Sequence, residues 1–210
     1  MINILIADDH AVVRKGLRQI LTETPDLRVA GEAVDGEDVL EKVEKNSYDV
    51  IVLDISMPGM SGLDALKRLN TEHPDLPVLV LSIYSEDQYA LRVLKAGASG
   101  YLTKESAPGE LVSAIRKVAK GGKYVSAYLA EKLAFGLTAP ANVNPHENLS
   151  DREMQVLCMI ASGKTISEIG KEISLSVKTV STYRRRILTK MKLKNNAELT
   201  HYAIRNNLIE

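Results

Sequence analysis

The sequence predicts a doubly wound α/β domain followed by a smaller, all-α domain. Up to residue 122, short apolar runs alternate with stretches of helical periodicity, the pattern of a parallel sheet covered by helices. From residue 149 onward the pattern is helical only. The charge changes at the same place, since residues 1–148 carry 16 Lys or Arg and 21 Asp or Glu, whereas residues 149–210 carry 11 and 6. A basic second domain in a chain of zero net charge is a candidate for binding nucleic acid.

Five apolar runs predict the strands of the first domain. They are rich in Val, Ile and Leu, and two are apolar throughout, as expected for strands buried on both faces. This length fits the flavodoxin-like doubly wound fold, with five parallel strands in the order 2-1-3-4-5 and right-handed crossovers. The expected strands are Ile2–Ala7, Leu27–Ala33, Val50–Leu53, Val78–Leu81 and Gly100–Leu102, with helices near 11–24, 37–46, 63–72, 87–96 and 109–120.

Residues 123–148 are expected to link the two domains. Tyr128–Phe135 predicts one short helix, and the stretch 138–145 contains two prolines among small or polar residues. The second domain, 149–210, should contain four short helices. Its helix signals are a capping box at Ser150 and Glu153, a break at Gly163, a helix over Thr165–Ile173, a third capped by Ser176 and running to about Met191, and a fourth capped near Asn195 and reaching Asn206.

Composition narrows the class of protein. No run approaches the ~20 apolar residues of a membrane-spanning helix, so no membrane partner is expected. The N-terminus has no basic segment before its apolar run and predicts a strand rather than a signal peptide. A single cysteine, Cys158, allows no internal disulfide. These features predict a cytoplasmic protein.

Polar side chains follow four of the predicted strands. Asp8 and Asp9 end the first strand, Asp54 the third and Ser82 the fourth, while Lys104 follows the fifth. Because parallel strands place their carboxyl ends at one edge, and the first and third strands are neighbours, the carboxylates should converge there. Clustered carboxylates in an open site suit Mg²⁺, which keeps several waters and bridges to a phosphoryl group.

Asp54 is the best placed nucleophile, since a carboxylate can form an aspartyl phosphate. The turn Met57-Pro58-Gly59 lies beside it. A receiver-domain signature of bacterial response regulators is what these residues resemble, together with Asp8, Asp9, Ser82 and Lys104. The resemblance spans the whole first domain.

That resemblance assigns roles to the pocket. It implies that Asp54 accepts a phosphoryl group from a sensor histidine kinase. Asp9, Asp54 and the main-chain carbonyl of Ser56 would bind Mg²⁺ directly, and Asp8 largely through water. Ser82 and Tyr101 match the family's switch pair, in which the hydroxyl moves toward the phosphoryl group and the ring turns inward. Lys104 would contact a phosphoryl oxygen.

The segment 173–197 contains no acidic residue and seven basic ones. On a helix, Val177, Val180, Tyr183, Ile187 and Met191 form a stripe that should be buried. A polar face edged with cations lies opposite and suits the major groove of DNA. The preceding predicted helix, Thr165–Ile173, is followed by a turn and then by this basic helix, which is the order of a helix-turn-helix. The residues of that face are Lys178, Ser181, Thr182, Arg185 and Thr189.

The second domain resembles the LuxR-type helix-turn-helix of the NarL/FixJ family of response regulators. The resemblance rests on residues 149–153, 163–165 and 176–181. By position, Ser181, Thr182 and Arg185 match base-reading residues of the family, and Lys178, Arg184 and Lys190 match phosphate contacts. It implies binding to promoter DNA as a homodimer when phosphorylated.

The sequence therefore predicts a transcription regulator rather than an enzyme. Two other interpretations stay open. An aspartate-nucleophile phosphatase would turn over exogenous phosphoesters, although such enzymes usually carry Asp-x-Asp at one strand end. A DNA-binding protein with an unphosphorylated receiver would not be labelled by acetyl phosphate.

Overall fold

The computed structural model describes residues 1–106, 108–136, 144–206 and 208–209. Its internal contacts divide the chain into a first unit, Met1–Ala130, and a second unit, Glu131–Glu210. This division falls within the segment 123–148 that the sequence assigns to the linker. Among the described residues, no helix combines the length and apolar character needed to cross a membrane.

The first unit is built on a five-stranded sheet in the order β2-β1-β3-β4-β5, with every neighbouring pair parallel. The predicted flavodoxin-like order is confirmed. β3 is buried along its whole length, as its apolar sequence predicts. The strands are β1 (Ile2–Ala7), β2 (Leu27–Ala33), β3 (Val50–Leu53), β4 (Val78–Ser82) and β5 (Gly100–Thr103).

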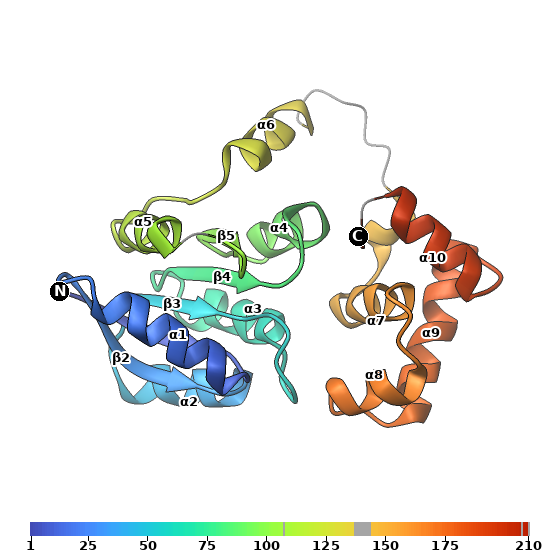
Figure 1. Cartoon of the computed structure of the whole chain (residues 1–210), viewed down its shortest axis with the longest axis horizontal. Helices are drawn as coiled ribbons and strands as arrows, with labels where there is room; N and C mark the ends of the chain where they lie inside the picture. The colour runs from blue at the N-terminus through green and yellow to red at the C-terminus, as the bar shows by residue number, and fades with distance from the viewer. Residues whose placement is uncertain (107, 137–143, 207, 210) are drawn as a thin grey trace. The chain divides into compact units, whose positions relative to one another are not determined.

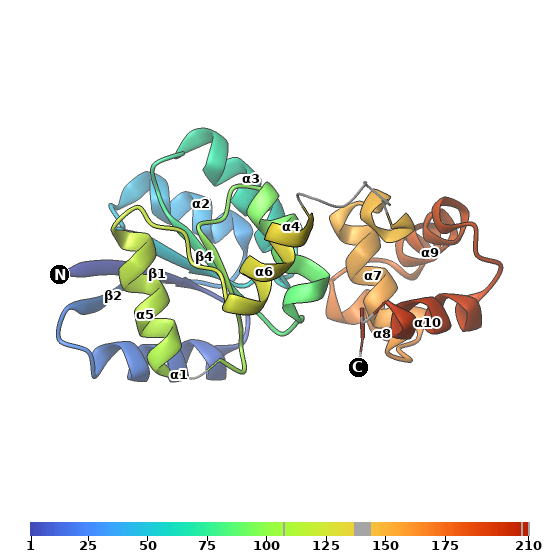
Figure 2. The same ribbon diagram turned by 90° about the horizontal axis from the view of Figure 1, so that it is seen from above.

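Helices cover both faces of this sheet (Figures 1 and 2). α1 (Ala11–Thr22) and α5 (Pro108–Ala119) lie on one face, and α2 (Gly36–Lys45), α3 (Gly62–Glu72) and α4 (Glu86–Lys95) on the other. Alternate strand residues such as Ile4, Val52 and Leu79 form a core with Leu21 of α1 and Ile115 of α5. Each predicted helix is found, with ends that differ from the expected ones by one or two residues.

The chain leaves α5 through Gly121, whose φ of +78° is a conformation that a glycine adopts without strain. It then runs beside the edge strand β5, where the Tyr124 N–H donates a 2.8 Å hydrogen bond to the Ser99 carbonyl oxygen. The Ser126 hydroxyl donates to Glu86 on α4 over 2.5 Å. The predicted short helix follows as α6 (Ala127–Gly136). Most of the proline-containing stretch lies outside the described residues.

The described residues from 144 onward form a short 3-10 turn, η1 (Pro145–Asn148), and four α-helices: α7 (Asp151–Ala161), α8 (Ile166–Glu172), α9 (Val177–Met191) and α10 (Asn196–Arg205). The four helices were predicted, and the 3-10 turn was not. The predicted capping box of α7 is present, because the Ser150 N–H donates to Glu153 over 2.7 Å while the Glu153 N–H donates back to the Ser150 hydroxyl. α7 packs against both α9 and α10.

One residue of the predicted buried stripe is misassigned. Val180, Ile187 and Met191 are buried, and Tyr183 is half-buried, but Val177 is 53% exposed. Val177 is the first residue of α9, and the burial of the stripe starts one turn later, at Val180. Helical periodicity identifies the face of a helix that is buried, but not how far along the axis the core extends.

Candidate functional sites

The pairing of β1 with β3 brings two carboxylates together. Ala7 is the partner of Leu53 in the parallel ladder, so Asp8 and Asp54 follow side by side. The Asp54 N–H donates to the Ala7 carbonyl oxygen over 2.8 Å. Asp8 is 1% exposed and Asp54 2% exposed. Two buried carboxylates this close repel each other unless a cation lies between them.

The Lys104 ammonium supplies positive charge to this pair. Its Nζ lies 2.5 Å from an Asp8 carboxylate oxygen and 2.8 Å from an Asp54 oxygen. Burial disfavours the Lys104 charge, but the two carboxylates outweigh it and raise the pKa of Lys104. Burial also raises the pKa of Asp54 above its ordinary value, because it outweighs the opposing effect of Lys104. The structure thus brings the predicted lysine into direct contact with the predicted nucleophile.

Asp9 completes a set of possible metal ligands. Ligand atoms of Asp8, Asp9, His10 and Asp54 lie within 4.8 Å of one another. The Asp9 Oδ1 atom is buried and accepts no hydrogen bond from the described residues, although His10 Nδ1 lies 2.8 Å away. A buried carboxylate oxygen without a hydrogen-bond donor, beside two further carboxylates, fits a hard divalent cation such as Mg²⁺. The Ser56 N–H donates to Asp54 over 3.1 Å, which places Ser56 at the same pocket.

Two further residues shape this pocket, and the sequence analysis did not identify them. Arg14 of α1 donates to the Asp8 carbonyl oxygen over 2.7 Å and to the Glu32 carboxylate over 3.1 Å, so it fixes the main chain of Asp8. Gly62 begins α3, and a Cβ atom there would lie 1.9 Å from the Asp54 carbonyl oxygen. A glycine at the start of a helix that follows a site carboxylate is the signal that points to such a close approach.

Ser82 and Tyr101, the predicted switch pair, lie on the adjacent strands β4 and β5. Both side chains are fully buried. The Ser82 hydroxyl oxygen accepts a 3.2 Å hydrogen bond from the Tyr84 N–H, and the Tyr101 hydroxyl donates to the Tyr84 carbonyl oxygen over 2.7 Å. Burial raises the pKa of Tyr101, so the phenol keeps its proton as a donor. The Tyr101 ring is fully buried, which corresponds to the inward position that the family resemblance describes.

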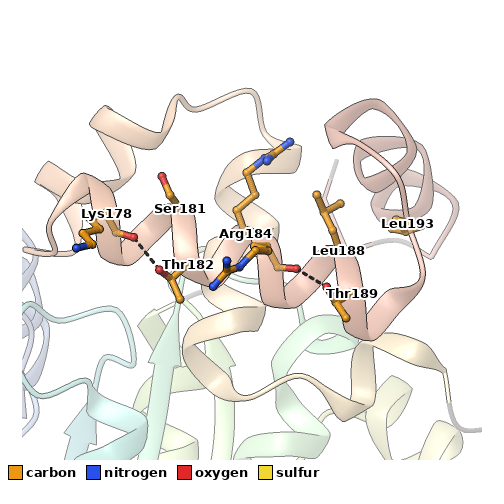
Figure 3. Close-up of a pocket in the computed structure, with 8 residues that line it drawn as sticks. Lys178, Ser181, Thr182, Arg184, Leu188, Thr189 and Leu193 are labelled. Carbon is orange, nitrogen blue, oxygen red and sulfur yellow. Dashed lines mark hydrogen bonds between the residues drawn. The ribbon is translucent and has the colours of Figure 1, made fainter.

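The polar face of α9 forms an open groove of about 580 Å³ in the second unit (Figure 3). The five residues predicted to share this face all line the groove. Arg184, predicted as a phosphate contact, and two leucines line it as well. The complete lining is Lys178, Ser181, Thr182, Arg184, Arg185, Leu188, Thr189 and Leu193.

Two of the predicted phosphate contacts have partners in the protein. The Lys190 ammonium donates to the Glu153 carboxylate on α7 over 2.6 Å, and the Lys190 side chain is 42% exposed. The Arg184 Nε donates to the Asn196 side-chain oxygen over 2.6 Å. Lys178 is exposed at the other end of the groove. The sequence pattern identifies Glu153 only as a capping residue, and its pairing with Lys190 is found only in the structure.

Comparison with known families and proteins covers both units. Residues 4–116 match the family of response regulator receiver domains, and residues 147–203 match the bacterial regulatory proteins of the luxR family. The chain is 40% identical over 209 residues to the response regulator UvrY of Escherichia coli K12, covering 99% of this chain and 96% of that protein.

The chain is a response regulator of the NarL/FixJ family. It is also 39% identical over 210 residues to the response regulator GacA of Pseudomonas protegens, covering 100% of this chain and 99% of the relative. Among solved structures, it resembles RcsB of Salmonella enterica serovar Typhimurium bound to the rprA promoter with the phosphomimetic BeF3⁻. That match has a TM-score of 0.66 and 28% identity, covering 96% of this chain and 97% of RcsB. The protein is thus a DNA-binding two-component response regulator.

Proposed function

We propose that this response regulator accepts a phosphoryl group on Asp54 from a sensor histidine kinase, and that the modification controls homodimerisation and the binding of α9 to promoter DNA. The observation that carries the proposal is the contact of Lys104 with Asp54 in a pocket lined by three carboxylates. The domains assigned to these tasks are 1–122 and 149–210, joined by 123–148. One solved structure similar to this chain contains two RcsB dimers bound to two parallel DNAs, which supports the expectation of a dimer.

The residues of the pocket divide the work of phosphoryl transfer. An Asp54 carboxylate oxygen attacks the phosphorus of a phosphohistidine, and the P–N bond breaks as the O–P bond forms. Lys104 moves from Asp54 to a phosphoryl oxygen and stabilises its charge. Asp8, Asp9 and Asp54, with the Ser56 carbonyl, would hold Mg²⁺, which neutralises charge on the phosphoryl oxygens. Ser82 donates its hydroxyl to a third oxygen.

The proposed DNA contacts of α9 divide into base readers and phosphate contacts. Ser181, Thr182 and Arg185 are proposed to reach base edges, since they lie on the exposed face of the proposed recognition helix. Lys178, Arg184 and Lys190 are proposed to contact phosphates. The protein would act in the cytoplasm, where both DNA and a kinase domain are accessible. The chain has a single cysteine, and the buried thiol of Cys158 fits a reducing compartment.

Phosphorylation is tested by intact-mass spectrometry after incubation with acetyl phosphate and Mg²⁺. The wild-type protein should gain the mass of one phosphoryl group, and Asp54→Asn should gain none. Asp9→Ala should also block labelling, through loss of Mg²⁺. Equal labelling of wild type and Asp54→Asn would remove Asp54 as acceptor, and turnover of an added phosphoester by wild type would favour an enzyme.

DNA binding is tested by titrating two variants against a duplex selected by the wild-type protein and against random DNA. Arg185→Ala should lose about 1–3 kcal/mol on the selected duplex and little on random DNA. Lys178→Ala should weaken both and reduce the slope of log affinity against log salt by about one. Identical behaviour of the two variants on both DNAs would contradict this division of roles.

A further inference from the structure

The two threonines of the α9 groove use their hydroxyl protons inside the helix. The Thr182 hydroxyl donates to the Lys178 carbonyl oxygen, and the Thr189 hydroxyl donates to the Arg185 carbonyl oxygen, each over 3.0 Å (Figure 3). Both acceptors lie one helical turn earlier, which is a common arrangement for threonine on a helix. In this conformation each threonine proton is engaged within the helix, and donation to a ligand would require that bond to break.

This bonding decides what each threonine offers to DNA. Guanine O6 and N7, adenine N7 and thymine O4 all require a donor, which these hydroxyls supply only by giving up the bond within the helix. What remains is the Cγ2 methyl group and the acceptor lone pairs of the oxygen. In the major groove, the one apolar group on a base edge is the C5 methyl of thymine.

The groove that Thr182 lines combines apolar surface with polar donors. Leu188 and Leu193 line the same groove toward its other end, beyond Arg184 (Figure 3). The neighbouring polar readers, Ser181 and Arg185, are exposed, and neither side chain has a hydrogen-bond partner among the described residues. These two can supply the donors, and Thr182, which is half-buried between them, supplies a methyl group.

We propose that Thr182 is a specificity-determining residue that recognises a thymine by contact between its Cγ2 methyl group and the C5 methyl of the base. The inference rests on the proposed function of the α9 face, and adds to it the chemistry by which one position of the site is read. The preferred site then contains a thymine whose methyl group matters, beside a base read by Arg185.

The test uses a duplex selected from a random pool by the acetyl-phosphate-treated wild-type protein. Each thymine is replaced in turn by deoxyuridine, which lacks only the C5 methyl. At one position this replacement should lower wild-type affinity about fourfold, the effect of one buried methyl group. Thr182→Ser should lose a similar factor on the unmodified duplex and show no further loss at that deoxyuridine. Thr182→Val, which keeps the methyl and removes the hydroxyl, should still lose affinity at that deoxyuridine, as the wild-type protein does.

The matched control is Thr71→Ser on α3, where the Thr71 hydroxyl makes the same 3.0 Å bond to the Lys67 carbonyl oxygen, outside the groove. This variant should keep wild-type affinity and sensitivity to deoxyuridine. Wild-type binding that no deoxyuridine alters would overturn the inference without using any variant. A loss of affinity in Thr182→Val, with binding kept in Thr182→Ser, would show that the hydroxyl is read instead. If Arg185→Ala also bound as wild type, the proposed interface itself would be wrong.

Discussion

The Tyr101 hydroxyl and the Ser82 hydroxyl both hydrogen-bond to the main chain of Tyr84. Tyr101 donates to the Tyr84 carbonyl oxygen over 2.7 Å, and the Tyr84 N–H donates to the Ser82 oxygen over 3.2 Å. If Ser82 turns toward a phosphoryl group on Asp54, the Tyr84 N–H loses its acceptor. Tyr84 must then move or find another partner, and the bond to Tyr101 changes with it. We therefore expect a movement of Ser82 to reach Tyr101 through Tyr84, whose main chain both side chains contact.

Ser82→Ala should separate phosphorylation from its output. The variant keeps Asp54, Lys104 and the carboxylates, so it should still be labelled by acetyl phosphate. It lacks the hydroxyl that links the phosphoryl group to Tyr84, so it should gain little dimerisation or DNA affinity. Sedimentation velocity and DNA titration at matched phosphorylation measure this, with the exposed Ser47→Ala as control. A labelled Ser82→Ala that dimerises and binds DNA like labelled wild type would remove Ser82 from the mechanism.

The stability of the protein should depend on the ionisation of Asp54. Its pKa is raised by burial, so its contribution to the free energy of unfolding is fully present below the ordinary carboxyl pKa of about 3.9 and is lost as pH rises through the raised value. Asp54→Asn should therefore melt at a higher temperature than wild type at neutral pH, by a margin that shrinks in acid. Thermal melts at several pH values measure the margin. The exposed control Asp75→Asn should show no such trend, and a margin that grows in acid would contradict the sign.

Arg14 should act as a positioning residue of the carboxylate pocket. Arg14→Met removes the hydrogen bond to the Asp8 carbonyl oxygen and the pairing with Glu32, but leaves every proposed ligand in place. Removal of such a supporting contact typically lowers metal affinity about 10–100-fold, and we expect the lower end. Isothermal titration calorimetry with Mg²⁺ measures it. Arg116→Met, which breaks the exposed pair with Asp26, should leave Mg²⁺ affinity unchanged, and equal affinities of all three proteins would exclude this role for Arg14.

Lys190 should stabilise the second unit even without DNA. Lys190→Met leaves the 2%-exposed Glu153 without its ammonium partner. Loss of a fully buried pair costs about 3–5 kcal/mol, but Lys190 is 42% exposed and screened by water, so we expect about 1–2 kcal/mol. Urea unfolding measures this cost, and the exposed Lys194→Met is the control. An unchanged free energy of unfolding would leave phosphate contact as the role of Lys190.

The same pair gives a pH dependence of opposite sign to that of Asp54. Burial favours the neutral acid, but Lys190 and the Ser150 N–H outweigh it and hold the pKa of Glu153 below its ordinary value. The contribution of the ionised Glu153 to the free energy of unfolding is therefore fully present above the ordinary glutamate pKa of about 4.3. It is lost as pH falls through the lowered pKa. In Lys190→Met, the free energy of unfolding should therefore fall less on acidification than it does in the wild-type protein.

The parts of this protein that could be predicted are those set by sheet geometry. Strand ends of a parallel sheet share an edge, so Asp8 and Asp54 could be placed together before any contact was known. The role of Arg14 could not be predicted, because it acts on a main-chain carbonyl that a sequence pattern does not locate. Gly62 has a signal in its place at the start of the helix after Asp54, but the atom it approaches is known only from the structure. The exposure of Val177 follows from its place at the first residue of α9, which periodicity does not reveal. The pairing of Lys190 with Glu153 spans 37 residues, and no local spacing signals it.

The stretch that follows α5 covers what would otherwise be an open strand. β5 is the last strand of the sheet, and Tyr124 pairs with its residue Gly100 as an isolated bridge. An uncovered edge strand offers its unpaired N–H and carbonyl groups to other chains and promotes aggregation. A receiver fragment cut after residue 122 would lose this cover, whereas one extended to Leu129, which is 3% exposed, would keep it. The segment that connects the two domains thus also protects the solubility of the first.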